Sequence, residues 1–239
     1  MATELLYFKD TYQFKGQSRV VEVIDSRNLV EDTPLNKTLK KHQHVVVLDS
    51  TLFYPQGGGQ PTDVGQIVGP QGQMQVKHVV LYNDKVYHLG EIEGALNEQE
   101  QVEMHVDEQV RLRNARCHSA GHVIFSIVKK HWSDRMTERK GHHFSDGAYV
   151  EFEGLLPEEQ TKESLEKLVN GVVDMDCLVL ATSSMVDGKE KRVIQVDGFE
   201  PNACGGTHVQ STKELGKVTI RKIARKAAQN FTKISYVTA

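Results

Sequence analysis

Residues 107–131, DEQVRLRNARCHSAGHVIFSIVKKH, divide the 239-residue chain into two parts with different patterns. Asp107 is a favourable N-cap for a helix. The apolar positions of the stretch recur with a helical period and lie at Cys117, Gly121, Ile124, Phe125 and Val128. We therefore predict one long helix here. This helix marks the change from a β-rich first part to a mixed second part.

The first hundred residues alternate short β-rich runs with clusters of Gly, Pro, Asn and Asp. These runs are RVVEVID, HVVVLDS, MQVKHVVLY, KVYHLG and EQVEMHV. Many short strands with little helical periodicity are typical of a small barrel. We predict a β-barrel domain over residues 1–106.

The second part, residues 107–239, mixes helical and strand patterns. Pro157 is expected to open a second helix, whose apolar face contains Leu165, Leu168, Val169 and Val172. Further β-rich runs are AYVEFEG, CLVLATSSM, KRVIQVD, KVTIRKIA and FTKISYV. The predicted fold class is therefore α+β, with the N-terminal barrel followed by a two-layer α/β domain that has a mainly antiparallel sheet.

Two short clusters contain the side chains that bind a soft, tetrahedral metal ion. In RCHSAGH, the i, i+4 spacing places His118 and His122 on one helix face. In NACGGTHV, two glycines separate Cys204 from His208, which favours a tight loop around an ion. A histidine pair alone is weak evidence in a chain with 11 His, but the second pair strengthens it. The four residues predict a site for one Zn²⁺ per chain, in a domain over residues 107–239.

The composition is that of a water-soluble globular protein, with 38% hydrophobic and 26% charged residues. No apolar run approaches the roughly 20 residues that span a membrane, and the first residues do not form a secretion signal. We expect no membrane partner and a cytoplasmic location. Cys117 and Cys177 are expected to be buried thiols, as in a reducing cytosol.

The net charge of −3 argues against extensive nucleic-acid binding, but the charge is uneven. After residue 210 there are seven basic residues and one acid, Glu214, which gives a local charge of +6. The basic residues are Lys213, Lys217, Arg221, Lys222, Arg225, Lys226 and Lys233. This segment suits a polyphosphate backbone, or alternatively is a solvated edge strand that its lysines protect from aggregation.

Residues 53–67, FYPQGGGQPTDVGQI, form a glycine-rich segment. Because glycine has no Cβ, another molecule can approach this backbone closely, and its N–H groups can hold an anion or a carbonyl oxygen. The segment lacks the Gly-Lys-Ser/Thr of a phosphate-binding loop, so we expect no nucleotide cofactor. A plain hairpin loop is the alternative. The polar Gln60 and Asp63 beside the glycines favour a binding role.

The segment KGHHFSDG offers further polar groups. Lys140 suits a phosphate contact, and His142 or His143 suits a proton carrier near neutral pH. For the two histidines, a surface turn before the next strand is the simpler interpretation.

Together these motifs resemble the alanyl-tRNA editing protein family (AlaX), free-standing relatives of the editing domain of alanyl-tRNA synthetase. The matching motifs are YPQGGGQPTDVG, HSAGH, KGHHFSDGAYVEF and NACGGTHVQSTKELG, and they cover nearly all of the chain. The resemblance implies a barrel that carries the glycine-rich motif and an α/β domain that holds zinc. It also implies hydrolysis of the ester that joins serine, or secondarily glycine, to alanine-specific tRNA.

The resemblance also implies roles for individual residues. Gln60 and Thr207 are the expected catalytic residues, orienting water or binding the serine hydroxyl. The remaining residues are Gly58, Gly59, Asp63 and Lys140 for substrate binding, and Arg221, Lys222, Arg225 and Lys226 for tRNA binding. At Gly121 many relatives carry a side chain that helps to shape the pocket.

Four protein ligands fill a tetrahedral ion, whereas hydrolytic zinc usually keeps one position open. The ion then expands its coordination, has one loose ligand, or shapes the pocket without activating water. Two other functions remain in view: a zinc hydrolase of another small ester or amide, and a non-catalytic tRNA-binding module with structural zinc. A fragment of a full synthetase is less expected, because the chain begins with Met and lacks an adenylation segment.

Overall fold

The computed structural model describes residues 2–29, 33–186 and 189–239. It has the predicted α+β class. The chain forms two compact units. The first contains Met1–Gly57 and Pro61–Leu112, and the second contains Gly58–Gln60 and Arg113–Ala239. The short segment Gly58–Gln60 therefore belongs with the second half of the chain, although its neighbours in sequence belong with the first.

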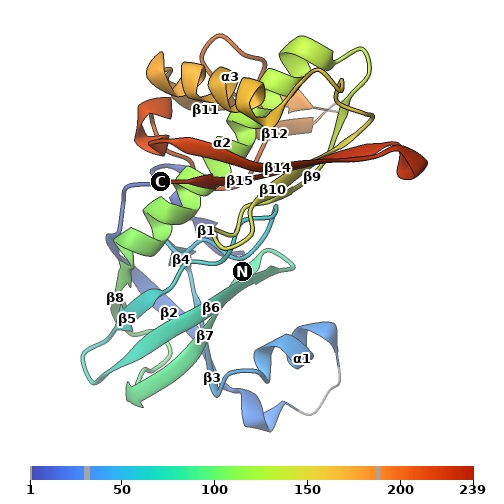
Figure 1. Ribbon diagram of the computed structural model, residues 1–239. Coiled ribbons are helices and arrows are strands. Elements are labelled where there is room, and N and C mark those ends of the chain that lie inside the picture. Colours follow the sequence, from blue (N-terminus) through green and yellow to red (C-terminus); the bar gives the residue numbers. More distant parts are fainter. Residues whose placement is uncertain (1, 30–32, 187–188) are drawn as a thin grey trace. The chain divides into compact units, whose positions relative to one another are not determined.

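The first unit contains a closed barrel in which every pair of neighbouring strands is antiparallel (Figure 1). This confirms the predicted small barrel. Around the barrel the strands are β2 (Lys15–Asp25), β3 (His44–Leu48), β7 (Lys85–Gly94), β6 (Gly72–Tyr82), β5 (Gly65–Val68) and β8 (Gln101–Val106). Outside it lie a parallel pair and a short helix, namely β1 (Glu4–Leu5), β4 (Ser50–Thr51) and α1 (Pro34–Leu39).

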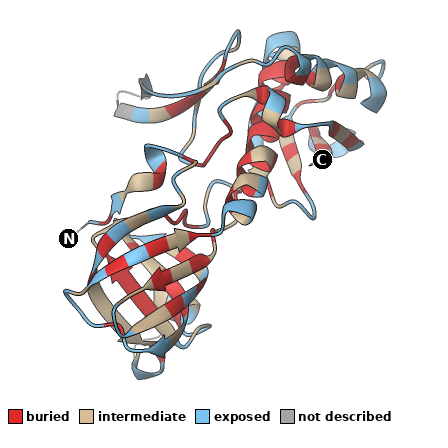
Figure 2. Ribbon diagram, turned by 90° about the vertical axis from the view of Figure 1, so that its left-hand side faces the viewer, coloured by how far each residue is buried: buried red, intermediate tan, exposed pale blue. Residues whose placement is uncertain are grey.

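Alternating burial along the strands fills the barrel interior (Figure 2). In β8, for example, Val102, Met104 and Val106 are buried while Gln101 and Glu103 are exposed. This is the two-residue period expected of strands with one face toward a core. The alternation of apolar and polar residues in the sequence therefore determines which side chains point into the barrel interior.

The second unit contains two antiparallel sheets (Figure 1). The larger has the order β14 (Val218–Lys226), β15 (Phe231–Thr238), β10 (Tyr149–Glu153) and β9 (Thr137–His142). The smaller has the order β11 (Val179–Val186), β12 (Lys189–Val196) and β13 (Asn202–Ala203). The predicted antiparallel arrangement is confirmed, but the strands divide between two sheets.

Two helices contribute to the core of this unit. The predicted long helix is confirmed as α2 (Glu108–Trp132), whose Ile124 and Val128 are fully buried. The second helix, α3, runs over Lys162–Asp174.

The prediction that Pro157 opens the second helix was wrong. Thr161 caps α3, since its hydroxyl accepts a hydrogen bond from the backbone N–H of Ser164. A turn closed by Gln160 N–H and Pro157 C=O precedes it. On the predicted apolar face, Leu165, Val169 and Val172 are buried, and Leu168 is 37% exposed.

In KGHHFSDG, a turn closed by the Gly147 N–H and the Phe144 C=O does precede β10, but the expectation that the two histidines belong to a surface turn was wrong. The first residues of this segment belong to β9, which pairs with β10 so that Lys140 lies opposite Glu151. Cross-strand pairing overrides the turn tendency of this polar, glycine-containing segment. As a result, His143 directly follows a strand and is only 2% exposed.

Two further expectations concern the cysteines and membranes. The three cysteines are free thiols, with Cys117 buried and Cys177 partly buried. Among the described residues, no helix has both the length and the apolar character needed to cross a bilayer.

Candidate metal centre

The structure brings together the four predicted zinc ligands, although 86 residues separate His118 from Cys204. His118 and His122 project from one face of α2, and Cys204 and His208 come from the loop after β13. Their ligand atoms all lie within 4.8 Å of one another. Each histidine of the quartet is no more than 6% exposed.

The donor set fits a tetrahedral ion. Bond lengths of about 2.0–2.3 Å to nitrogen and sulfur place neighbouring ligand atoms about 3.3–3.8 Å apart. The Cys204 Sγ atom lies 3.5 Å from Nε2 of His118 and 3.3 Å from Nε2 of His208. One thiolate and three imidazoles favour Zn²⁺ over the hard cations Mg²⁺ and Ca²⁺.

The protonation states of the histidines also favour metal binding. Burial and, to a smaller extent, the positive charge of Arg192 together lower the pKa of His122 to about 4. Burial likewise lowers the pKa values of His118 and His208 well below the ordinary histidine value. All three imidazoles are therefore neutral at pH 7, as a metal ligand must be.

The pKa of the Cys204 thiol is subject to opposing influences. Burial raises the pKa of the Cys204 thiol, while a hydrogen bond from the Gly206 N–H and the charge of Arg192 lower it. The Gly206 nitrogen lies 3.4 Å from Sγ. A divalent cation in the quartet would favour the thiolate over the neutral thiol.

Gln60 and Thr207 form a buried hydrogen-bonded pair next to the quartet. Gln60 Oε1 lies 2.7 Å from Nδ1 of His118 and accepts a hydrogen bond from the Thr207 N–H at 3.0 Å. Gln60 Nε2 donates to Thr207 Oγ1 at 2.9 Å. Both residues are 0% exposed. The amide of Gln60 therefore orients the His118 ring so that Nε2 faces the Cys204 sulfur.

A serine between the two histidines of α2 does the same for His208. Ser119 Oγ lies 3.0 Å from Nδ1 of His208 and also accepts a hydrogen bond from the Val209 N–H. No role for Ser119 was predicted from the sequence. Its position in the HSAGH motif, directly after a ligand, was the only available signal.

The loop between Cys204 and His208 is held tightly by its surroundings. Arg192 donates hydrogen bonds to the carbonyl oxygens of Cys204 and Gly206 at 2.8 and 2.9 Å. A Cβ at position 206 would lie 2.2 Å from Cε1 of His118 and 2.7 Å from Gln60 Oε1. The second glycine of the motif is therefore required by close packing against a ligand.

His143 occupies the space left by Gly121. Its ring stacks on that of His118 with a centroid distance of 4.4 Å, and its Nδ1 lies 2.6 Å from the Tyr236 hydroxyl. A Cβ at Gly121 would lie 2.4 Å from the His143 ring and 2.8 Å from that hydroxyl. Burial lowers the pKa of His143 to about 3, so the ring is neutral. The His143 ring thus fills the space that a side chain at position 121 of α2 would otherwise occupy.

The glycine-rich segment reaches this region through Gly59. Its carbonyl accepts a hydrogen bond from the His143 N–H at 2.8 Å. Gly58 and Gly59 have φ values of 55° and 80°, in the left-handed region. A Cβ at Gly59 would lie 2.3 Å from the Gly141 carbonyl oxygen. This close approach of two backbones explains why glycine is needed at that position.

Asp63 lies in the first unit and has a structural partner. It is fully buried, and its Oδ2 accepts a hydrogen bond from Nε of Arg111 at 2.9 Å. The same guanidinium donates to the Thr11 and Leu52 carbonyl oxygens. The structure thus gives Asp63 a role in tying three segments of this unit together, and its predicted substrate contact stays a prediction.

The remaining predicted residues lie on or near the larger sheet. Lys140, Arg221, Lys222 and Lys226 are exposed. Arg225 is partly buried, and its guanidinium donates to the carbonyl oxygens of Leu156, Pro157 and Gln160 at 2.6–2.7 Å. Arg225 therefore differs from the other three basic residues, because its donors hold the chain before α3.

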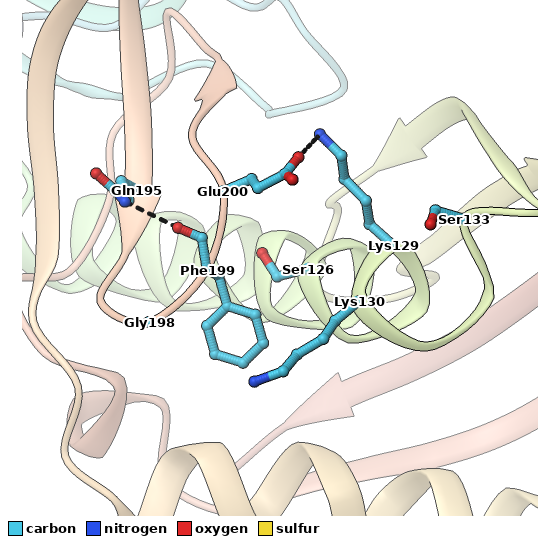
Figure 3. Close-up of a pocket in the computed structure, with 8 residues that line it drawn as sticks. All are labelled: Ser126, Lys129, Lys130, Ser133, Gln195, Gly198, Phe199 and Glu200. Atoms are coloured by element: carbon cyan, nitrogen blue, oxygen red, sulfur yellow. Dashed lines mark hydrogen bonds and ion pairs between the residues drawn. The ribbon is translucent and has the colours of Figure 1, made fainter.

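A hollow of about 440 Å³ opens farther along α2 (Figure 3). Ser126, one turn after His122, lines it together with Lys129 and Lys130. Lys129 pairs with Glu200 at 2.7 Å, and the Lys130 ammonium lies over the Phe199 ring at 4.9 Å. The two lysines of this hollow thus already have partners within it.

Models of two known protein families match separate parts of the chain. Residues 2–110 match the model described as tRNA synthetases class II (A), and residues 192–231 match the threonyl and alanyl tRNA synthetase second additional domain. The second match includes Cys204 and His208.

Curated proteins with similar sequences extend over almost the whole chain. The alanyl-tRNA editing protein AlaX-L of Pyrococcus horikoshii is 28% identical over 250 residues, which cover 98% of this chain and 57% of that protein. AlaX-M of Methanosarcina barkeri is 29% identical over 255 residues, covering 95% and 96%. The chain is a relative of the alanyl-tRNA editing proteins.

This editing-protein relative also resembles part of the synthetases. The alanine–tRNA ligase of Methanopyrus kandleri is 33% identical over 198 residues, which cover 73% of this chain but 21% of that enzyme. The chain thus spans a little over half of AlaX-L, a fifth of the ligase and nearly all of AlaX-M.

Proposed function

We propose that this protein is a zinc-dependent aminoacyl-tRNA hydrolase that removes wrongly attached amino acids from alanine-specific tRNA. The observation that carries the proposal is the buried Cys-His₃ quartet with Gln60 hydrogen-bonded to His118. Similarity to alanyl-tRNA editing proteins over nearly the whole chain supports it. We further propose a cytoplasmic location and functional domains over residues 1–106 and 107–239.

The chemistry required is modest, because an aminoacyl ester is already activated toward water. Zn²⁺ held by His118, His122, Cys204 and His208 would supply a Lewis acid that polarises an oxygen atom. Gln60 and Thr207 position the ligand His118 through their shared hydrogen bonds. The protein's main contribution is then a fixed geometry for the ester and for water.

Serine is the proposed first substrate and glycine the second. A site that hydrogen-bonds the serine hydroxyl rejects alanine, because polar groups would be left unpaired when the hydroxyl is missing. Between Cys204 and His208, Thr207 is the residue that carries a hydroxyl group. Gly58, Gly59, Asp63 and Lys140 remain proposed substrate-binding residues.

For the tRNA backbone, we propose that Arg221, Lys222 and Lys226 contact phosphates, because all three are exposed cations on one strand. Arg225 is proposed to support the same surface from within, through its three bonds to backbone carbonyls. The contribution of these contacts would weaken as salt rises.

A deacylation assay tests this function. Alanine-specific tRNA charged with serine, glycine or alanine is incubated with zinc-loaded protein, and with protein treated with a chelator. We expect rapid loss of serine, slower loss of glycine, little loss of alanine, and dependence on metal. Stable seryl-tRNA with zinc-loaded protein would overturn the proposal.

The closed set of four protein ligands favours one alternative, a tRNA-binding module with structural zinc. It predicts tRNA affinity without deacylation. The same assay, combined with a tRNA binding measurement, separates the two functions. Hydrolysis of model esters without any preference for tRNA would instead indicate a general zinc esterase.

A further inference from the structure

The outer face of the larger sheet carries a row of stacked rings, of which only His142 was given a suggested role, as a proton carrier, from the sequence. The His142 ring stacks on Phe144 with a centroid distance of 4.4 Å and an interplanar angle of 9°. On its other side it stacks on Tyr149 at 5.0 Å and 24°. All three residues are partly exposed. We refer to Phe144, His142 and Tyr149 as the ring row.

The ring row lies close to the candidate metal centre along the chain. His142 ends β9, and the next residue, His143, stacks on the ligand His118. Successive side chains of an extended segment point to opposite faces. His143 is buried beside the quartet, whereas His142 is partly exposed on the other face. The central ring of the row and the ring that stacks on the ligand His118 therefore belong to two consecutive residues, His142 and His143.

Cations border the row on the same sheet. The Lys233 ammonium lies 3.2 Å from the centroid of the Tyr149 ring. Lys233 and Tyr149 also line a hollow of about 470 Å³ together with Arg221, Ser235, Ser145 and Asp146. Two acids also lie near these cations. Asp146 lines the hollow, and a carboxylate oxygen of Glu151 lies 3.9 Å from the Lys233 ammonium.

The two ends of the row differ in their partners. Lys233 covers Tyr149, and His142 lies between two rings. Phe144, at the other end, has His142 as its one ring partner among the described residues. A planar ring placed on the second face of Phe144 would extend the row.

We propose that the ring row is a stacking platform for an unpaired base near the 3′ end of RNA, with Arg221 and Lys233 contacting the adjoining phosphates. This rests on the proposed function, since a charged tRNA presents its amino acid on an unpaired 3′ end. Aromatic rings beside cations are the combination that binds single-stranded nucleic acid without reading its sequence. Double-stranded RNA keeps its bases stacked within the helix and would not use the row.

The test compares an RNA hairpin that has an unpaired 3′ ACCA with the same hairpin ending blunt. Zinc-loaded protein is titrated with each, and Kd is measured by fluorescence anisotropy at fixed salt. The main variant is Phe144→Leu, which keeps an apolar side chain but removes the ring face. We expect it to bind the overhang hairpin about five- to a hundredfold more weakly. Its affinity for the blunt hairpin should not change.

Phe199→Leu is the matched control, because Phe199 is also a partly exposed phenylalanine and lies outside the ring row. It should leave both affinities unchanged. Zinc content and melting temperature are compared for both variants, and Tyr149→Leu provides a second disruption of the row if Phe144→Leu fails to fold.

Two outcomes would overturn the platform: an unchanged preference of Phe144→Leu for the overhang hairpin, or equal binding of both hairpins by the unaltered protein. The deacylation assay separates this inference from the proposed function. If seryl-tRNA is hydrolysed and Phe144→Leu leaves KM unchanged, only the platform fails. If the unaltered protein hydrolyses no charged tRNA, the proposed function fails, while the hairpin comparison still decides the platform.

Discussion

The Oε1 atom of Gln60 lies 2.7 Å from Nδ1 of His118, across 58 residues of sequence. When His118 is neutral, its proton lies on Nδ1, which donates to Gln60. The Nε2 atom is then unprotonated, faces Cys204 and can bind a metal ion. The Nε2 atom is indeed 3.5 Å from the Cys204 sulfur. Gln60 thereby links the glycine-rich motif to the metal quartet through one fixed ring.

Replacing Gln60 with Ala should lower zinc affinity about 10- to 100-fold, because the His118 ring loses the partner that fixes its orientation. Competition with a chromophoric chelator measures the affinity. Gln101→Ala, at an exposed position of β8, is the control and should bind zinc as the unaltered protein does. Equal zinc affinity of the Gln60 variant would show that Gln60 does not position His118.

Gly206→Ala should destabilise the second unit by about 1–3 kcal/mol and reduce zinc content, because the new methyl group overlaps the His118 ring. Chemical unfolding and metal analysis measure the two effects. Gly171→Ala is the matched control, since no atom lies within 4 Å of its Cβ position in α3. It should stabilise the protein by about 0.5–1 kcal/mol. Normal zinc content in Gly206→Ala would contradict the packing argument.

Arg225 and Lys222 should respond differently to replacement, although both belong to the basic segment. Arg225→Ala removes three charge-assisted hydrogen bonds to carbonyls, so it should lower the free energy of unfolding by about 2 kcal/mol or more. Lys222→Ala, at an exposed position, should leave stability within about 0.5 kcal/mol.

The salt dependence of tRNA binding gives the second measurement on these residues. Lys222→Ala should flatten the slope of log affinity against log salt by about one unit if Lys222 contacts a phosphate. An unchanged slope would remove Lys222 from the proposed phosphate contacts. Unchanged stability of Arg225→Ala would mean that its bonds do not anchor the chain before α3.

The buried side chain of His88 should make the free energy of unfolding of the barrel depend on pH. Burial lowers its pKa to about 4, against the ordinary histidine value of 6.5, and the ring forms hydrogen bonds with the Thr51 hydroxyl and the Val46 carbonyl. Below pH 6.5 the unfolded chain takes up a proton at this position and the folded protein does not. Stability that is fully present above pH 6.5 is therefore lost as the pH falls toward 4, by about 3 kcal/mol at most.

The comparison variant is His88→Asn, which keeps a donor for the Val46 carbonyl but does not titrate. Free energies of unfolding measured between pH 7 and pH 4.5 should fall less steeply for this variant than for the unaltered protein. The difference between the two curves isolates His88 from the other buried histidines. Parallel curves would show that His88 titrates normally in the folded barrel.

Much of the fold follows from local sequence patterns. The alternation in EQVEMHV predicts the strand that became β8, and the helical spacing from Cys117 to Val128 predicts α2. These patterns succeed because they depend on residues close in sequence. Of the two failures, the first has the opposite cause, whereas the second comes from a local cap that was not recognised. β9 forms because a polar segment finds a partner strand in β10, and the start of α3 is set by the Thr161 cap instead of Pro157.

The sequence by itself determined which side chains are suited to zinc: His118, His122, Cys204 and His208 are recognisable by type and spacing. Only the tertiary structure decided what surrounds them. Gln60 and Thr207 are 147 residues apart yet hydrogen-bonded, and His143 fills the space beside Gly121. Spacing rules describe one turn of helix or one strand. Contacts between distant segments depend on how the whole second unit packs, and no local pattern encodes them.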